Sequence, residues 1–244
     1  MPGVPEEVQR FEYTSEVDGT HDWGLAWPSS SDTWVVQIHG HGSGGDQLFT
    51  RPDIRKSGLG VLTVNLRGNA WMCDSAARDL HSVLSFVREK WGAKKFVFAS
   101  GSMGGTSNLI YAVRHPEDVT GVVALCPATD LASYHTWCRK SALPVSQEIA
   151  DAIERFYGGT PKDKRSAYAV SSAIDNSDKL RMPVFVCHGT ADTIIPVSQS
   201  RQLVGKMGDL TSFAYVEIPD GGHDAPLGAF AQGLDWVLRK VAGS

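Results

Sequence analysis

Short, almost continuous runs of apolar residues recur along this chain, and segments with helical spacing separate them. Continuous apolar runs, as opposed to alternating ones, are typical of strands buried on both faces of a parallel sheet. The predicted core strands are residues 34–39, 60–66, 95–99, 119–126, 183–187 and 212–218. Ahead of them, two alternating segments, 8–16 and 22–27, are joined by Asp18-Gly19 and predict an antiparallel hairpin.

The segments between these runs predict helices. Apolar residues fall on one stripe between positions 80 and 91, and Asp74 is placed to N-cap that helix. A second helix is expected from 103 to about 115, because Pro116 cannot continue it. Pro196 suits the first turn of a third helix, and residues 230–241 form a fourth. This alternation predicts a three-layer α/β fold with a mostly parallel central sheet, helices on both faces and an N-terminal antiparallel hairpin.

One segment interrupts the alternation of strands and helices. About 55 residues lie between the strand that ends at 126 and the strand that begins at 183, which is more than one crossover needs. They include a predicted helix over 146–157. We therefore interpret the chain, residues 1–244, as a single domain with a small cap-like insertion at 128–180.

Composition limits the partners and the compartment. The chain has 244 residues and a formal net charge of −4, without a cluster of basic residues, which disfavours nucleic-acid binding. No signal peptide and no membrane-spanning window is recognisable. The four cysteines are scattered without CxxC spacing, as reduced core thiols would be. We expect a cytoplasmic protein that binds neither nucleic acid nor membrane, and the sequence leaves its oligomeric state open.

The strongest chemical signal is the segment SGSMGG, residues 100–105, between a predicted strand and a predicted helix. A serine on such a tight turn projects from the top of the sheet, and the strained backbone requires small neighbours. Ser102 is the predicted nucleophile, although Ser100 replaces the first glycine of the usual G-x-S-x-G pattern. The alternative is a glycine-rich loop that binds phosphate, but the lysine of a P-loop and an acidic ribose partner are missing.

A serine nucleophile needs a base and an acid that orients the base. His223 follows the last predicted strand, and Asp192 lies a short loop beyond a buried strand, so both belong at the carboxyl edge of the sheet. Asp130 and Asp224 are the alternative acids. Other histidines are expected to be structural, at strand ends, or exposed: His39, His188, His21, His81 and His115.

The chain order of nucleophile, acid and base is that of α/β-hydrolases and excludes the chymotrypsin and subtilisin orders. The chain also resembles the catalytic domain of the prolyl oligopeptidase-like and serine aminopeptidase-like α/β-hydrolases. The matching motifs are SMGG at 102–105, HGTAD at 188–192 followed by Ile195-Pro196, Gly222-His223, HGHG at 39–42 and Arg67-Gly68. Departures from the family pattern occur at Asn65, Ala70 and Met72.

This resemblance implies an oxyanion hole formed by the backbone N–H groups of His41 and Met103. It also implies a serine hydrolase without a metal or organic cofactor. Esters of small or medium acyl groups are the favoured substrates, because peptidase relatives usually carry a β-propeller ahead of this domain. Alternatives are a short-peptide aminopeptidase, a thioesterase, an acyltransferase or a non-catalytic ligand-binding homologue. Side chains expected to contact a small-molecule ester are Trp71, Met72, Tyr134, His135 and Trp137.

Overall fold

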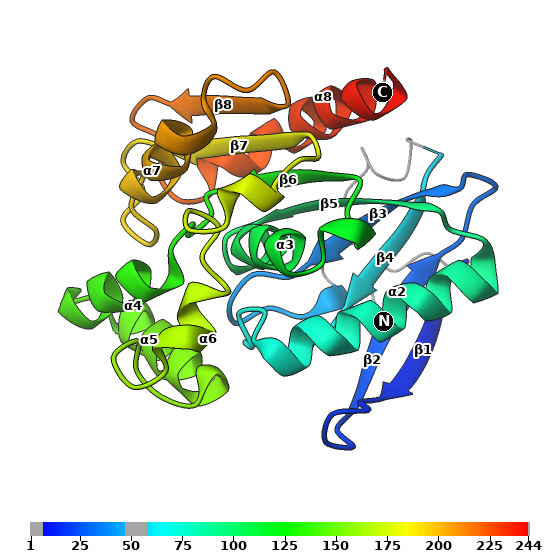
Figure 1. Ribbon diagram of the computed structural model, residues 1–244, viewed down its shortest axis with the longest axis horizontal. Helices are drawn as coiled ribbons and strands as arrows, with labels where there is room; N and C mark the ends of the chain where they lie inside the picture. The colour runs from blue at the N-terminus through cyan, green and yellow to red at the C-terminus, as the bar shows by residue number, and fades with distance from the viewer. Residues whose placement is uncertain (1–6, 47–57, 244) are drawn as a thin grey trace.

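An eight-stranded sheet forms the centre of the protein (Figure 1). The computed structural model describes residues 7–46 and 58–243. The strand order is β1-β2-β4-β3-β5-β6-β7-β8; β1 pairs antiparallel with β2 and β2 with β4, whereas all later pairs are parallel. The strands are β1 (Gln9–Thr14), β2 (His21–Trp27), β3 (Thr33–Ile38), β4 (Gly60–Val64), β5 (Lys95–Gly101), β6 (Gly121–Leu125), β7 (Val184–Gly189) and β8 (Phe213–Ile218). The predicted α/β fold, its mostly parallel sheet and its antiparallel entry are confirmed.

Helices cover both faces of this sheet. On one face lie α2 (Asp74–Trp91), α3 (Met103–Arg114) and α7 (Ser198–Met207), and on the other lies α8 (Phe230–Ala242). Asp74 is the first residue of α2 and not its N-cap, because Cys73 occupies that position without a side-chain hydrogen bond. Across the two described ranges, no helix combines the length and the apolar character needed to cross a bilayer.

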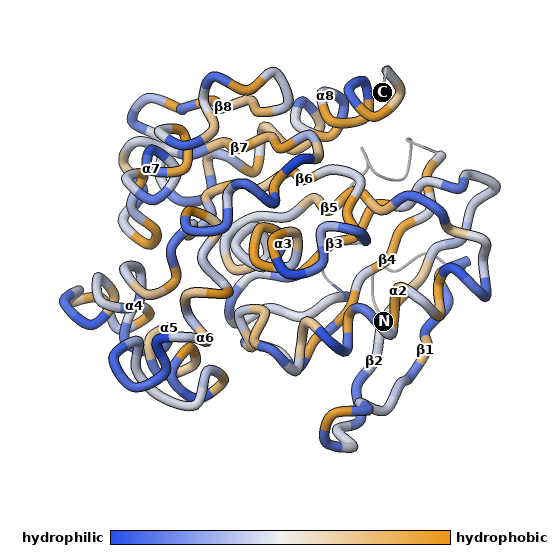
Figure 2. The backbone as a smooth tube through the Cα atoms, in the orientation of Figure 1, coloured by the Kyte–Doolittle hydropathy of each residue, from blue (hydrophilic) through white to orange (hydrophobic). Residues whose placement is uncertain are grey.

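Burial explains why the central strands have continuous apolar sequences. Every residue of β4, β6 and β7 is buried, since helices pack on both faces. Helix α8 instead carries one apolar stripe, and Figure 2 shows apolar and hydrophilic stretches alternating along it. Its buried residues, Phe230, Gly233, Leu234 and Val237, follow the helical period and face the sheet.

Residues 128–180, the predicted insertion, hold three α-helices and a 3-10 turn. They are α4 (Leu131–Lys140), α5 (Pro144–Tyr157), α6 (Arg165–Ala169) and η3 (Ser177–Lys179). The expected helix over 146–157 lies within α5, whereas the sequence had not indicated α4. These helices gather beside the layers of the main fold in Figure 1. Hydrogen bonds tie them to it: the Tyr157 hydroxyl donates to the carbonyl of Trp71 at 3.0 Å, and the Tyr134 hydroxyl to that of Ile194 at 3.1 Å.

Candidate active site

Three strand ends bring together a serine, a histidine and an aspartate. Ser102 follows β5, Asp192 follows β7 and His223 follows β8, and parallel strands place their carboxyl ends at one edge. The His223 Nε2 atom lies 2.8 Å from the Ser102 Oγ atom, and the Nδ1 atom lies 2.7 Å from Asp192 Oδ2. With an ionised carboxylate as its partner, Nδ1 carries the proton, and Nε2 is left to accept the hydrogen bond from the serine hydroxyl.

Asp192 is held as a carboxylate by its surroundings. Its Oδ1 atom accepts hydrogen bonds from the backbone N–H groups of Ile194 and Ile195, at 2.8 and 2.9 Å. Burial raises the pKa of Asp192, but contacts with His188 and His223 outweigh burial and hold that pKa well below its usual value. The fully buried His188 places its Nε2 atom 3.2 Å from Asp192 Oδ2. Sequence reasoning identified His188 only as structural and missed this contact.

The backbone at Ser102 has the strained shape expected of a strand-to-helix turn that exposes its side chain. Its φ of 57° and ψ of −128° are unusual for a residue with a side chain. Gly104, two residues later, packs so closely on β3 that a Cβ atom there would lie 2.0 Å from the Ile38 carbonyl oxygen. Ser100 also has a structural role, because its Oγ accepts a hydrogen bond from the Ile38 N–H at 2.9 Å. The departure from the glycine pattern thus supplies an acceptor to the neighbouring strand.

Gly104→Ala is expected to destabilise the protein and to slow hydrolysis. The added methyl group pushes α3 away from β3, which costs roughly 1–3 kcal/mol of the free energy of unfolding and displaces the Ser102 turn. Gly205→Ala, in α7, is the matched control, because nothing lies within 4 Å of the place that its methyl group would take and alanine favours helix. Urea unfolding and steady-state kinetics measure both effects. Equal stability of the two variants would contradict this packing argument.

Hydrogen bonds fix the backbone on the N-terminal side of His41, a predicted oxyanion donor. The His39 Nδ1 atom lies 2.8 Å from the Gly40 carbonyl oxygen, which also accepts a hydrogen bond from the Ser43 N–H at 3.1 Å. Fixing that oxygen also fixes the trans peptide, so the His41 N–H points the opposite way. Met103 is the first residue of α3, where N–H groups lack an acceptor within the helix. Met103 directly follows Ser102, and His41 lines the same cavity as Ser102.

A cavity of about 380 Å³ opens beside Ser102 and His223. This volume suits a small organic ligand. Apolar side chains from the insertion and from the segments after β7 and β8 form much of its wall: Val145, Ile149, Ile194, Leu227 and Phe230. Sequence reasoning missed these residues, because apolar positions on helices have the same pattern whether they face the core or a cavity. Asp224 also lines the cavity, whereas Asp130 caps α4 through the N–H groups of Ala132 and Ser133.

None of the five side chains predicted to contact substrate occurs among the described residues that line this cavity. Trp71 and Met72 are buried, and Tyr134 packs between Trp71 and Trp137, with ring centroids 5.6 and 6.0 Å away. His135 is buried too and its Nε2 atom lies 2.7 Å from Glu154. The rings of Trp71, Tyr134 and Trp137 pack against one another, which is the commoner use of large aromatic side chains.

Trp71 nevertheless contacts a residue that lines the cavity. Its indole Nε1–H donates a hydrogen bond of 3.3 Å to His41 Nδ1, and His41 lines the cavity. Burial lowers the pKa of His41, with the charge of Glu148 opposing the shift. A neutral imidazole is also what the indole donor requires, because the accepting nitrogen must be unprotonated.

A comparison with known protein families shows to which family the chain belongs. Residues 32–166, more than half of the chain, match the family described as "Serine aminopeptidase, S33". The chain belongs to this family. It is accordingly a serine hydrolase of the α/β-hydrolase superfamily, and the resemblance drawn from its motifs is confirmed.

Among the proteins similar to this serine hydrolase, the solved structures carry names that describe different activities. The uncharacterised protein YfhR of Salmonella typhi is 26% identical over 253 residues, which cover 93% of this chain and 79% of that protein. Among solved structures, a puromycin hydrolase has a TM-score of 0.73 and 18% identity, and esterase Pf2001 of Pyrococcus furiosus has a TM-score of 0.69 and 18% identity. The chain covers 39% of the puromycin hydrolase chain and 91% of the esterase chain. These structural likenesses support the fold.

Backbone strain in this serine hydrolase is confined to the same edge of the sheet. Within the described ranges, every non-glycine residue with positive φ follows the carboxyl end of β4, β5, β6 or β8: Leu66, Arg67, Trp71, Met72, Ser102, Cys126 and Asp220. Such conformations cost roughly 1–3 kcal/mol each and persist where the surrounding structure imposes them, as it commonly does at functional sites.

Proposed function

We propose that this serine hydrolase cleaves carboxylic esters of small or medium acyl groups through an acyl-enzyme formed on Ser102. The observation that carries the proposal is the apolar cavity beside the hydrogen-bonded Ser102, His223 and Asp192 side chains. An acyl chain is uncharged and gains from apolar contact, at about 0.8 kcal/mol for each buried methylene.

In the proposed mechanism, the Ser102 hydroxyl attacks the ester carbonyl while His223 Nε2 takes its proton. Asp192 holds the histidine in the required tautomer and stabilises the imidazolium. The N–H groups of His41 and Met103 bind the oxyanion, each for about 3–4 kcal/mol when well aimed. His223 returns the proton to the leaving alkoxide, and water then releases the acyl group by the same steps in reverse order.

The principal alternative is hydrolysis of short peptides with a free amino terminus. Such a substrate brings a charged ammonium group, which needs a carboxylate partner in the cavity. Asp224 is the one acidic side chain among the described residues that line it, and it adjoins His223 in the sequence. The wall is otherwise mainly apolar, which favours acyl esters.

A panel of chromogenic substrates tests the proposed function. We expect kcat/KM to rise from p-nitrophenyl acetate to butyrate by about fourfold for each methylene, until the chain outgrows the cavity. Ile149→Trp should fill the cavity and reverse that order, while the exposed Leu210→Trp should leave it unchanged. If aminoacyl p-nitroanilides are turned over with a higher kcat/KM than every ester, the ester proposal is wrong and the peptidase alternative replaces it.

A further inference from the structure

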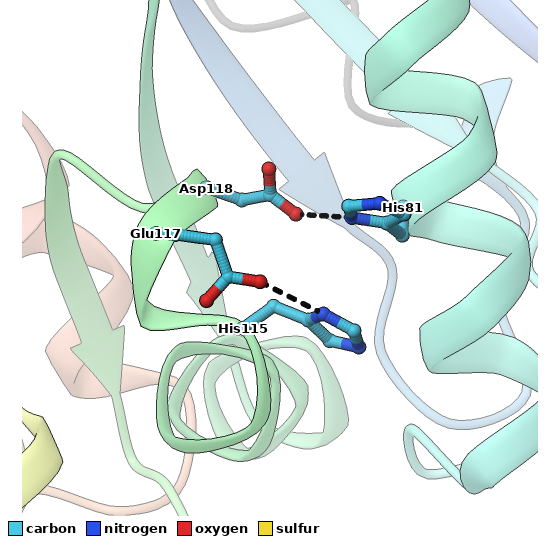
Figure 3. A group of neighbouring side chains, drawn as sticks. All are labelled: His81, His115, Glu117 and Asp118. Carbon is cyan, nitrogen blue, oxygen red and sulfur yellow. Dashed lines mark hydrogen bonds and ion pairs between the residues drawn. The ribbon is translucent and has the colours of Figure 1, made fainter.

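A cluster of two histidines and two carboxylates lies at the far end of α3 from Ser102 (Figure 3). Ser102 immediately precedes this 12-residue helix and His115 immediately follows it, so about 18 Å of helix separates the two regions. His81 comes from α2, and Glu117 and Asp118 come from the 3-10 turn η2 (Pro116–Asp118). One nitrogen or oxygen atom from each of the four side chains lies within 4.8 Å of the others.

The spacing of these atoms approaches that of a tetrahedral zinc site. Zinc binds histidine nitrogen and carboxylate oxygen at about 2.0–2.2 Å, which puts neighbouring ligand atoms about 3.3–3.5 Å apart. The His115 Nδ1 and Glu117 Oε1 atoms are 3.4 Å apart. His81 Nδ1 and Asp118 Oδ2 are 2.7 Å apart and need to separate by less than an ångström. The side chain of His81 is 46% exposed, which leaves it free to turn.

Ring stacking orients both imidazoles. The His115 ring packs between Tyr111 and His81, with centroid distances of 5.0 and 5.1 Å and interplanar angles of 25° and 22°. Because a metal ion lies in the plane of each imidazole that it binds, the exposed His81 ring has to turn out of this stack to share an ion with His115.

Asp118 is supported in the way that metal-binding carboxylates usually are. Its side chain is 3% exposed; Oδ2 accepts a hydrogen bond of 2.6 Å from the Tyr111 hydroxyl, and Oδ1 accepts one of 2.7 Å from Arg88. Such partners fix the orientation of a ligand and strengthen metal binding.

We propose that His81, His115, Glu117 and Asp118 form a zinc site that joins α2 to the turn after α3. Folding brings His81 to the other three residues, which are neighbours in the sequence, so the ion binds the native arrangement more tightly than the unfolded chain and stabilises the fold increasingly as its free concentration rises. This role is separate from hydrolysis.

The test measures thermal unfolding and calorimetric binding of the metal-free full chain with ZnSO₄ alone. We expect one zinc ion per chain and a melting temperature that rises with zinc concentration. Glu117→Gln and His115→Ala should weaken binding by about tenfold or more, and Glu117 is exposed enough for its replacement to leave the fold intact. His21→Ala, an exposed histidine on β2, is the matched control and should bind like the wild type.

A second variant distinguishes zinc binding at the four proposed ligands from nonspecific zinc binding at the protein surface. Tyr111→Phe removes only the hydroxyl that supports Asp118, and binding should weaken by about 10–100-fold with no ligand lost. Cys126, Asp192 and His223 also bring donor atoms within 4.8 Å of one another and could hold zinc themselves. The titration is therefore repeated with His223→Ala. This variant should still bind zinc at His81, His115, Glu117 and Asp118. The proposal fails if zinc does not bind, if His115→Ala binds like the wild type, or if binding disappears with His223→Ala alone.

Discussion

Ser102→Ala is expected to lower kcat for p-nitrophenyl butyrate by about 10⁶-fold, because no other hydroxyl can occupy the same place on the strained turn. The side chain is small and its partner His223 is partly exposed, so the melting temperature should change little. Steady-state kinetics and labelling with a fluorophosphonate measure the loss. Ser85→Ala on the exposed side of α2 is the control, and it should retain full rate and full labelling.

Two outcomes would contradict the assignment of Ser102. Turnover within tenfold of the wild type would mean that another group attacks the carbonyl. Absence of turnover and labelling in the wild type itself would favour the non-catalytic, ligand-binding alternative. If Ser102→Ala loses both labelling and turnover while Ser85→Ala keeps both, the result supports the acyl-enzyme mechanism.

Asp192→Asn should lower kcat by about 10⁴-fold while KM changes little. The asparagine fits the same buried space, and its oxygen can still accept from the N–H groups of Ile194 and Ile195. Its amide nitrogen cannot accept from His223 Nδ1–H, so the histidine adopts the tautomer that cannot take the proton from Ser102. A proton-NMR spectrum of the histidine ring and a full kinetic profile check both statements.

Asp130→Asn is the matched control for the acid. Asp130 caps α4, and asparagine is an equally good N-cap, so stability and rate should remain near the wild-type values. If Asp130→Asn lowers kcat and Asp192→Asn does not, the acid that orients His223 lies after β6 and not after β7. Asp224→Asn completes the set, because Asp224 also lines the cavity.

The central fold was predictable because its signals are local. Buried parallel strands need continuous apolar runs, and the helices between them show their apolar stripe within 10–18 residues. Helix α4 escaped prediction although its buried residues, Leu131, Tyr134, His135 and Cys138, follow the helical period, because the stripe is only ten residues long and includes the polar His135. It packs on the neighbouring α5 and on the turn after β7, and the second of these contacts joins residues 60 positions apart.

The catalytic candidates were also predictable from local signals, whereas the residues of the cavity wall were not. Ser102, Asp192 and His223 each sit beside a strand end that the apolar pattern marks, and small neighbours point to tight turns. The wall of the cavity depends on how the insertion packs over the sheet, which no local pattern records. For this reason Trp71 and Tyr134 were expected at the substrate and lie behind His41, while Ile149 was not expected and lines the cavity.

The wide separation of the three hydrogen-bonded side chains along the chain has a consequence for how this protein can be assayed. Ser102 and His223 are 121 positions apart, and Asp192 and His223 are 31 apart. Their alignment requires β5, β7 and β8 to be paired in one sheet, together with the turns that follow them. Partly folded chains therefore have no route to partial activity, and the fraction of full hydrolysis in a sample reports the fraction of molecules whose sheet is complete.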